Sequence, residues 1–306
     1  MSEIMLRTTT LTKKFKQYAA VNQVSLTVNR GEIYGFIGRN GAGKTTFLKM
    51  VSGLTYPTQG KIELFGEDCS KDSNLFNRIG VLIEAPGLYG GLTAFENLKA
   101  KCIAYGISDN NYINDLLGFV GLADTGKKKA KNFSLGMKQR LGIAMALIGD
   151  PDLLVLDEPI NGLDPQGIVE IRDTILKLNK EKNITIIISS HILEELSKIA
   201  SNYGIIHEGK LVQQLTREEL LSRCSEHIEI KTTQTKEACT VLEESLNIHN
   251  YKVVDSSTIY VLERFNETGT INMALASKGI LVNSINTTSD DLETYFLNLT
   301  GGANHA

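Results

Sequence analysis

The sequence of 306 residues predicts an α/β protein, in which a mixed β-sheet forms the core of a large first domain and a small α+β domain follows. Three observations predict this fold class. A short apolar segment at 32–37 leads through a glycine-rich loop into a helix, and a second apolar run at 152–157 ends in acidic side chains, as buried parallel strands do. After residue 221 the alternation of strands and helices starts again. We therefore expect domains at 1–221 and 222–306.

The composition is that of a globular protein, with 42% apolar and 22% charged residues. A net charge of −3 argues against a nucleic-acid binder that relies on bulk electrostatics. The sequence has neither a signal-peptide pattern nor an uninterrupted long apolar run, so we expect that the chain does not span a membrane by itself. The cysteines lack a C-x-x-C pair, which argues against a zinc site or a disulfide framework and fits a reducing, cytosolic setting. They are Cys69, Cys102, Cys224 and Cys239.

The glycine-rich loop, GRNGAGKTT at 38–46, fits the P-loop pattern in its strand–loop–helix context. The glycines let successive N–H groups point into one concavity, which attracts phosphate together with the helix N-terminus. Lys44 would reach the β- and γ-phosphates of a nucleotide, Thr45 would ligate Mg²⁺, and Thr46 would add a phosphate contact. A glycine-rich turn with a solvated lysine is the alternative, which the eight-position match disfavours. The predicted cradle comprises Arg39, Asn40, Gly41, Ala42, Gly43, Lys44, Thr45 and Thr46.

Around this loop, alternating apolar and polar residues at 4–12 and 23–28 predict antiparallel strands with one solvated face. A further strand at 61–65 ends in a turn, so we expect an antiparallel β-subdomain beside the P-loop. Phe15 and Tyr18 lie in a polar turn between the first two strands. An aromatic side chain there either caps the core or stacks on a nucleotide base.

A strand at 79–84 is followed by a loop and then by a largely helical stretch, which predicts a helical subdomain at about 85–150. Its first helix opens with a capping box at Thr93-Ala94-Phe95-Glu96. Within it, the segment NFSLGMKQR at 132–140 leads into an apolar helix at 141–148. A serine and a glycine before a helix are compatible with a simple N-cap, so this segment alone is weak evidence for a binding site.

The apolar run at 152–157 ends in Asp157 and Glu158, and ligands bind at the carboxyl ends of such strands. Mg²⁺ held by Asp157 and a water oriented by Glu158 would give both acids a role. A plain strand end with exposed acids is the alternative, which the P-loop disfavours. After a helix at 166–180 and a strand at 184–189 comes His191. A lone histidine is often a structural hydrogen-bonder, but its place at a third strand end favours the γ-phosphate.

The rest of the first domain is a strand pair at 202–207 and 210–214 that turns at Glu208-Gly209. The second domain has the order βαββαβ plus a terminal helix, which is the ferredoxin-like order. We identify no catalytic constellation in it. Its expected elements are a strand at 227–232, a helix at 236–245, strands at 252–255 and 258–262, a helix at 269–277, a strand at 281–286 and a helix at 290–299.

Taken together, these segments resemble the ATP-binding subunits of ABC transporters over residues 4–220. Five motifs carry the resemblance in the order of that family: the P-loop, FSLGMKQR at 133–140, LLVLDEP at 153–159, NGLDP at 161–165 and ISSHI at 188–192. Further segments are similar to the subgroup that protects cells against bacitracin and lantibiotics. They are IGVLIEAPGLYGGLTAFENL at 79–98, SLGMKQRLGIA at 134–144, IIHEGKL at 205–211 and SDDLETYFLNLTGG at 289–302.

The resemblance implies an ABC ATPase fold, the cofactors ATP and Mg²⁺, and a role for each matching residue. Phe15 would stack on adenine and Lys44 would act with the phosphate cradle. Asp157 would hold Mg²⁺, Glu158 would be the catalytic base and His191 the switch histidine. The resemblance also implies a head-to-tail dimer with two shared ATP molecules. Ser134 and Gly136 would contact the γ-phosphate of ATP bound to a second copy, and Asp164 would lie in the loop that crosses between subunits.

One position departs from the wider family, in which a glutamine ends the strand near residue 84, touches Mg²⁺ and couples to the membrane subunit. Here the residue is Glu84, as in the peptide-antibiotic subgroup. It is a candidate metal ligand, and whether it ligates Mg²⁺ or acts through the partner interface stays open at this point.

The resemblance implies a subunit that energises the export or removal of a peptide antibiotic and so confers resistance or self-immunity. ATP binding would close the dimer and hydrolysis would reopen it. The partner would be a separate transmembrane permease, docked around 84–97, which places the chain in the cytoplasm against the inner face of the membrane. No nucleic-acid partner is expected.

A soluble ABC ATPase acting on ribosomes or DNA is the alternative. It is disfavoured because the chain has one cassette and only about ninety residues between Lys44 and Ser134, too few for an added coiled-coil arm. A P-loop GTPase or kinase is disfavoured because no N-K-x-D motif follows, residues 179–182 being NKEK.

Overall fold

The structure is a computed structural model that describes residues 3–223, 226–289 and 292–300. The chain divides into two compact units, residues 1–217 and 218–306, which are considered separately below. The predicted boundary after residue 221 falls inside helix α7 (Arg217–Arg223), four residues after the division between the two units. Within the described residues, no helix combines the length and the apolar character needed to cross a bilayer.

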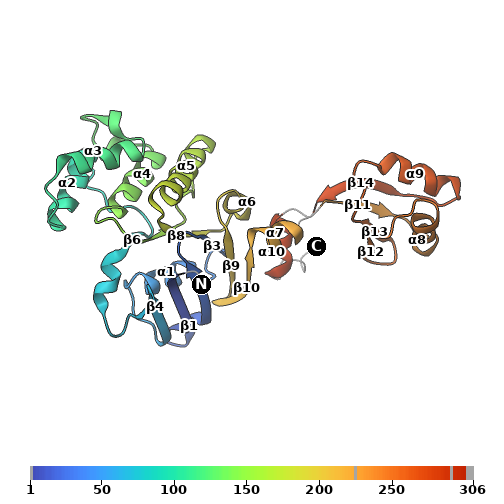
Figure 1. Ribbon diagram of the computed structural model, residues 1–306, viewed down its shortest axis with the longest axis horizontal. Helices are drawn as coiled ribbons and strands as arrows, with labels where there is room; N and C mark the ends of the chain where they lie inside the picture. The colour runs from blue at the N-terminus through green and yellow to red at the C-terminus, as the bar shows by residue number, and fades with distance from the viewer. Residues whose placement is uncertain (1–2, 224–225, 290–291, 301–306) are drawn as a thin grey trace. The chain divides into compact units, whose positions relative to one another are not determined.

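The first unit contains an antiparallel sheet of order β2-β1-β4-β5, the predicted β-subdomain (Figure 1). Its strands β1 and β2 are longer than the predicted 4–12 and 23–28. Their pairing shifts register several times, for example between Thr8 and Leu11, and such bulges interrupt the alternation of apolar and polar residues. The strands are β1 (Ile4–Phe15), β2 (Tyr18–Asn29), β4 (Gln59–Leu64) and β5 (Glu67–Asp68).

The second sheet of this unit is the predicted mixed sheet, of order β10-β9-β3-β8-β7-β6. Its strands are parallel except for β10, which forms the predicted hairpin with β9. Every residue of β3, β7 and β8 is buried, as strands covered on both faces must be. The strands are β3 (Ile33–Ile37), β6 (Ile79–Leu82), β7 (Leu153–Asp157), β8 (Thr185–Ser190), β9 (Asn202–His207) and β10 (Lys210–Thr216).

One buried core joins the two sheets through helix α1 (Lys44–Val51), where the ring centroids of Phe36 and Phe47 lie 4.7 Å apart. The parallel arrangement brings the carboxyl ends of β3, β7 and β8 to one edge of the mixed sheet, beside the start of α1. That edge carries the site described below.

Helices α2, α3 and α4 gather into the predicted helical subdomain (Figure 1). The capping box at Thr93 is present, with Thr93 Oγ1 accepting from the Glu96 N–H and the Glu96 carboxylate accepting from the Thr93 N–H. The expectation that an apolar helix begins at residue 141 is wrong. Helix α4 begins at Leu135 because Ser134 caps it by accepting from the Met137 N–H at 3.2 Å, so Gly136 lies in the first turn.

The helices of the first unit after α1 are α2 (Ala94–Ala104), α3 (Asn110–Phe119), α4 (Leu135–Ala146), α5 (Pro165–Lys182) and α6 (Leu193–Ser197), with 3₁₀ turns η1 (Ser73–Arg78), η2 (Ala123–Thr125) and η3 (Ala130–Asn132).

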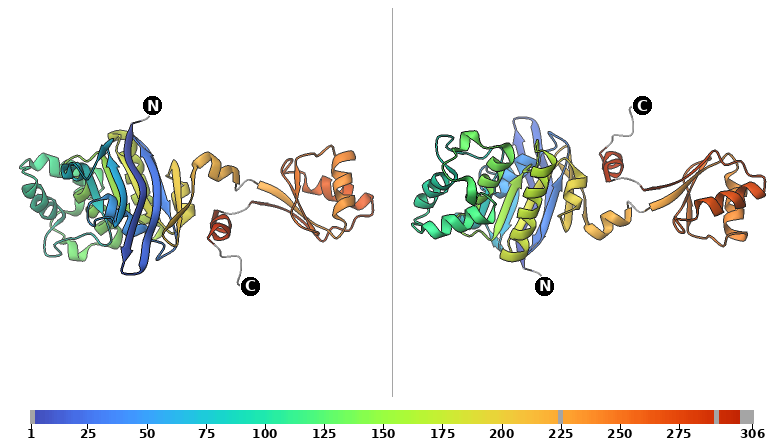
Figure 2. Two further views of the ribbon diagram at one scale, coloured as in Figure 1. Left: turned by 90° about the horizontal axis from the view of Figure 1, so that it is seen from below. Right: turned by 90° about the horizontal axis from the view of Figure 1, so that it is seen from above.

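The second unit has the predicted βαββαβ order, and its four strands form an antiparallel sheet of order β12-β13-β11-β14. Helices α8 and α9 lie side by side (Figure 2). They pack against an apolar core that includes Ile230, Leu242 and Ile259. The last strand lies three residues later than expected, and two residues of the expected helix at 290–299 lie outside the described residues. The elements are β11 (Glu226–Lys231), α8 (Thr235–Glu244), β12 (Tyr251–Val253), β13 (Thr258–Val261), α9 (Thr268–Ser277), β14 (Ser284–Ser289) and α10 (Leu292–Leu299).

Candidate nucleotide-binding site

The loop between β3 and α1 owes its shape to glycine. Gly41 and Gly43 have φ angles of 82° and 108°, in the left-handed region that other residues rarely adopt. A side chain at Gly43 would also collide with the backbone oxygen of Ala20 on β2. The turn between β9 and β10 holds the loop from another side, because the Gly209 N–H donates to the Ala42 carbonyl at 2.9 Å. The Gly209 carbonyl in turn accepts from the Asn22 N–H on β2 at 2.8 Å.

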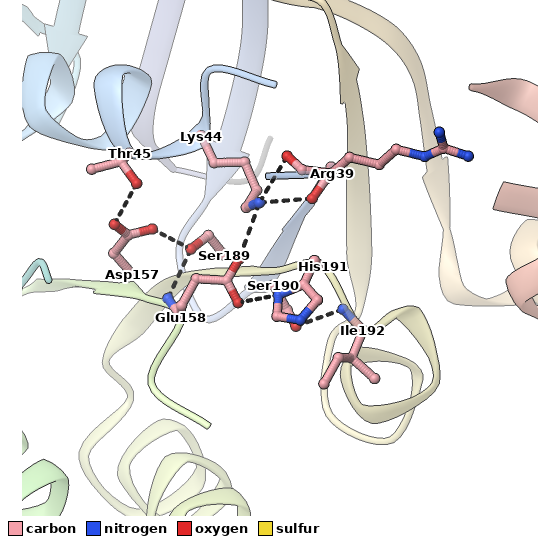
Figure 3. Close-up of polar contacts among 10 residues, drawn as sticks. Arg39, Lys44, Thr45, Asp157, Glu158, Ser189, Ser190, His191 and Ile192 are labelled. Atoms are coloured by element: carbon pink, nitrogen blue, oxygen red, sulfur yellow. Dashed lines mark hydrogen bonds and ion pairs between the residues drawn. The ribbon is translucent and has the colours of Figure 1, made fainter. Parts of the chain in front are cut away.

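An open pocket of about 360 Å³ lies over this loop. Phe15 and Tyr18 stand at the pocket with 53% and 60% of their surface exposed, so the alternative that these rings cap the core is wrong. Two residues of the predicted cradle, Ala42 and Arg39, are not among the lining residues. Ala42 is buried. The carbonyl oxygen of Arg39 accepts from Lys44, while its guanidinium points away from the other site residues (Figure 3). The lining residues are Phe15, Tyr18, Ala20, Asn40, Gly41, Gly43, Lys44, Thr45, Thr46 and Glu158.

Lys44, Glu158 and His191 meet at the carboxyl edge of the sheet, as the sequence predicted (Figure 3). The Lys44 ammonium, only 5% exposed, donates to the carbonyl oxygens of Gly38 at 2.7 Å and Arg39 at 3.3 Å. It also forms an ion pair with Glu158 Oε1 at 3.0 Å. The other oxygen of that carboxylate, Oε2, lies 2.8 Å from His191 Nδ1.

A second group of contacts centres on Asp157, which is 5% exposed at the end of β7. Thr45 Oγ1 donates to Asp157 Oδ2 at 2.7 Å, and Ser189 Oγ donates to Asp157 Oδ1 at 2.6 Å. Ser189 Oγ also accepts from the Glu158 N–H at 2.9 Å. The sequence did not indicate a role for Ser189, although this residue lies inside ISSHI. Its partner Asp157 is 32 residues away in the sequence, and strand register brings the two together.

Glu84 lies apart from these two groups. It follows the end of β6 with a φ of 63°, and its carboxylate, 66% exposed, forms an ion pair with Lys49 Nζ at 2.6 Å. Lys49 belongs to helix α1. The assignment of Glu84 as a metal ligand therefore stays a prediction, with no contact to Asp157 or Thr45 among the described residues to support it.

Ser134, Gly136 and Asp164 form a neighbourhood of their own, outside the pocket lining. Asp164 caps helix α5 by accepting from the Gly167 N–H at 3.1 Å, as Ser134 caps α4. A Cβ atom on Gly136 would lie 3.8 Å from Gly167, so the starts of the two helices are adjacent. Two helix N-termini side by side favour a negatively charged ligand, and no contact links them to Lys44 in the described chain.

Comparison with known proteins gives a consistent result. A family model described as "ABC transporter" matches residues 21–161. The bacitracin transport ATP-binding protein BcrA of Bacillus licheniformis is 45% identical over 97% of this chain and 98% of its own length. The lantibiotic transport ATP-binding protein SrtF of Streptococcus pyogenes is 44% identical over 68% of this chain and 89% of its own length.

Solved structures agree on the fold. The ATP-binding subunit of an ABC transporter superposes with a TM-score of 0.62 at 31% identity, over 71% of this chain and 91% of that one. The ATP-binding cassette MJ0796, a dimer bound to ADP and phosphate, superposes with a TM-score of 0.63 at 24% identity, over 70% of this chain and 99% of that one.

Proposed function

We propose, from the premise that this chain belongs to the ATP-binding proteins of ABC transporters, that it energises the export of a peptide antibiotic or its removal from the membrane. The chain is an ATPase, and the compound proposed is bacitracin-like or lantibiotic-like, as the names of BcrA and SrtF suggest for those proteins. Resistance or self-immunity would result.

The observation that carries the proposal is the meeting of Lys44, Glu158 and His191 beside the glycine loop. The loop N–H groups and the Lys44 ammonium would bind the β- and γ-phosphates, with Phe15 against the adenine. Glu158 would accept the proton of the attacking water, because it is the acidic residue among those that line the pocket. His191 would fix the orientation of that carboxylate through Nδ1 and would present its other ring nitrogen, Nε2, to the γ-phosphate.

The residues around Asp157 fit Mg²⁺. A hydroxyl and a carboxylate placed 2.7 Å apart are the hard oxygen donors that this ion prefers, and it usually completes its shell with substrate phosphates and water. Thr45 and Asp157 would hold the ion, with Glu84 as the further candidate. When bound, the ion would neutralise the charge that develops on the phosphate oxygens during transfer.

The helix starts at Ser134, Gly136 and Asp164 support a dimer. They lie outside the pocket lining of their own chain, and the positive ends of their helix dipoles suit a phosphate held by a second copy arranged head to tail. A separate transmembrane permease would dock around 84–97 and hold the chain, otherwise cytoplasmic, on the inner face of the membrane. This surface includes the exposed Glu84–Lys49 ion pair.

Antibiotic susceptibility tests this function directly. Cells that express the chain with its permease should survive bacitracin or a lantibiotic better than cells with the permease and a Glu158→Gln chain. The chain should also copurify with that permease. An active ATPase that protects against no peptide antibiotic and binds no membrane partner would contradict the proposal and favour a soluble role.

A further inference from the structure

We propose that Ser189 is a positioning residue for ATP hydrolysis, holding Asp157 and Glu158 in their working geometry through a single hydroxyl group. This inference rests on the roles proposed above for those two acids.

The placement of Ser189 comes from the sheet. In the parallel register of β7 and β8, Asp157 and Ser189 are direct partners, and Ser189 is fully buried. Its hydroxyl donates its one proton to Asp157 Oδ1 at 2.6 Å and accepts from the Glu158 N–H at 2.9 Å. A hydroxyl has one donor and two acceptor positions, so both contacts are compatible and together they define where the hydroxyl points.

The first contact orients the Asp157 carboxylate. With Oδ1 held by Ser189, the plane of the carboxylate is fixed and Oδ2 faces the Thr45 hydroxyl (Figure 3). Oδ2 is thus the oxygen directed at the proposed cation position. Without Ser189, the only one of these two contacts left would be that from Thr45, a residue proposed to bind the cation itself.

The second contact holds the backbone of Glu158. This residue has a φ of 48°, in the left-handed region where a residue other than glycine is uncommon and is maintained by its surroundings. The Ser189 oxygen accepts from the amide of that residue, and the side chain that follows reaches both Lys44 and His191. One hydroxyl therefore acts on the metal-binding acid and on the base.

The same strand supplies a matched control. Thr185 is also fully buried on β8, and its hydroxyl oxygen accepts from the Gly31 N–H at 2.9 Å, at the opposite end of the strand from the site. Replacement of either residue by an apolar one removes one buried hydroxyl from the same strand. Only Ser189 touches the two acids.

The experiment compares Ser189→Ala with Thr185→Val in the full chain. We expect Ser189→Ala to lower kcat about 10- to 100-fold with KM nearly unchanged, since small misplacement of catalytic groups has effects of this size. The Mg²⁺ concentration that half-saturates the binding of a fluorescent ATP analogue should rise about tenfold, because a charge-assisted contact to the metal-binding carboxylate is lost. Thr185→Val should keep both quantities within about twofold while its Tm falls as much as that of Ser189→Ala.

A Ser189→Cys variant guards against misfolding of the alanine variant, because a thiol is a weak donor and acceptor of similar shape and should give intermediate values. The proposal is overturned if Ser189→Ala keeps kcat and Mg²⁺ dependence within about twofold, or if Thr185→Val loses as much as Ser189→Ala. Glu158→Gln distinguishes a failure of the proposed function of the site from a failure of the role proposed for Ser189. If that variant hydrolyses ATP normally, the proposed function of the site fails. If it is inactive while Ser189→Ala is normal, only the role of Ser189 fails.

Discussion

The two edges of the mixed sheet carry charge in different ways. At the carboxyl edge Lys44 and Glu158 are largely buried and converge on one pocket. At the amino edge Arg78 Nε lies 2.8 Å from Asp152 Oδ2 and Arg30 Nε lies 2.6 Å from Glu3 Oε2, which is as close as any pair in the site.

The amino edge also has a pocket, of about 320 Å³, yet its paired side chains are 31–54% exposed. Short distances and a hollow are therefore common to both edges. Left-handed backbone is common to both edges as well, at Gly43 and Glu158 on one side and at Asp150 and Asn183 on the other. What distinguishes the carboxyl edge is buried charge, which carries a free-energy cost that a functional site explains.

The largest expected effect tests this contrast at Lys44. Lys44→Ala should weaken ATP binding at least about 100-fold, because the ammonium supplies charged hydrogen bonds worth about 3 kcal/mol to the phosphates. Lys49→Ala on the same helix is the matched control and should bind ATP normally, since Lys49 pairs with exposed Glu84. Equilibrium titration with nucleotide measures both. Equal affinity in the two variants would remove the distinction between buried and exposed lysine.

Glu158→Gln should lower the hydrolysis rate by about 10²–10⁴ while ATP stays bound, because the amide cannot accept the proton of water but keeps the shape of the side chain. Such a variant should accumulate as an ATP-dependent dimer, since reopening requires hydrolysis. Single-turnover assays and sizing with and without ATP provide the measurement. A variant that stays monomeric in both conditions would count against the shared-site dimer.

Glu84→Gln should change ATP affinity by less than about threefold, because an exposed ion pair contributes about 1 kcal/mol or less. If Glu84 couples the site to the permease, antibiotic protection should fall more than ATPase activity in the assembled transporter. Protection equal to the parent would show that the glutamate is only a permitted variant of the family's glutamine.

The smallest effect is expected at the amino edge. Asp152→Asn removes a carboxylate that two arginines contact, yet the free energy of unfolding should fall by less than about 1 kcal/mol and ATP hydrolysis should not change. Urea unfolding at pH 7 and a matching ATPase assay test the substitution, and a loss of activity would contradict the contrast between the edges.

At the same edge the Arg30 hydrogen bond lowers the pKa of the Glu3 carboxyl. The Arg30–Glu3 pair therefore stabilises the fold above the ordinary glutamate pKa and loses its contribution as the pH falls through the lowered value.

Much of this fold follows from local patterns in the sequence. The glycine loop, the buried strands β7 and β8 and the capping box at Thr93 were predicted because each is encoded within a few consecutive residues. The βαββαβ order of the second unit was predicted for the same reason.

The rest depends on contacts between distant residues or on backbone geometry that a pattern does not reveal. Because bulges interrupt the alternating pattern, the predicted strands were shorter than β1 and β2. Helix α4, capped by Ser134, begins six residues before the predicted start at residue 141. Ser189 was missed because its partner is set by strand register. Glu84 follows the end of β6 with left-handed backbone, which the sequence pattern did not reveal. Its carboxylate forms an ion pair with Lys49.

The turn Glu208-Gly209, which bonds to Ala42 on one side and to Asn22 on the other, has a thermodynamic consequence for the phosphate cradle. A loop bonded to a turn that is itself bonded to β2 has few conformations left to lose when a ligand arrives. The entropy of ordering it is lost once, when the chain folds, and little of it is subtracted from the binding free energy. The affinity of the cradle for phosphate is therefore tied to the stability of the β9–β10 hairpin, although Gly209 has no side chain to offer a ligand.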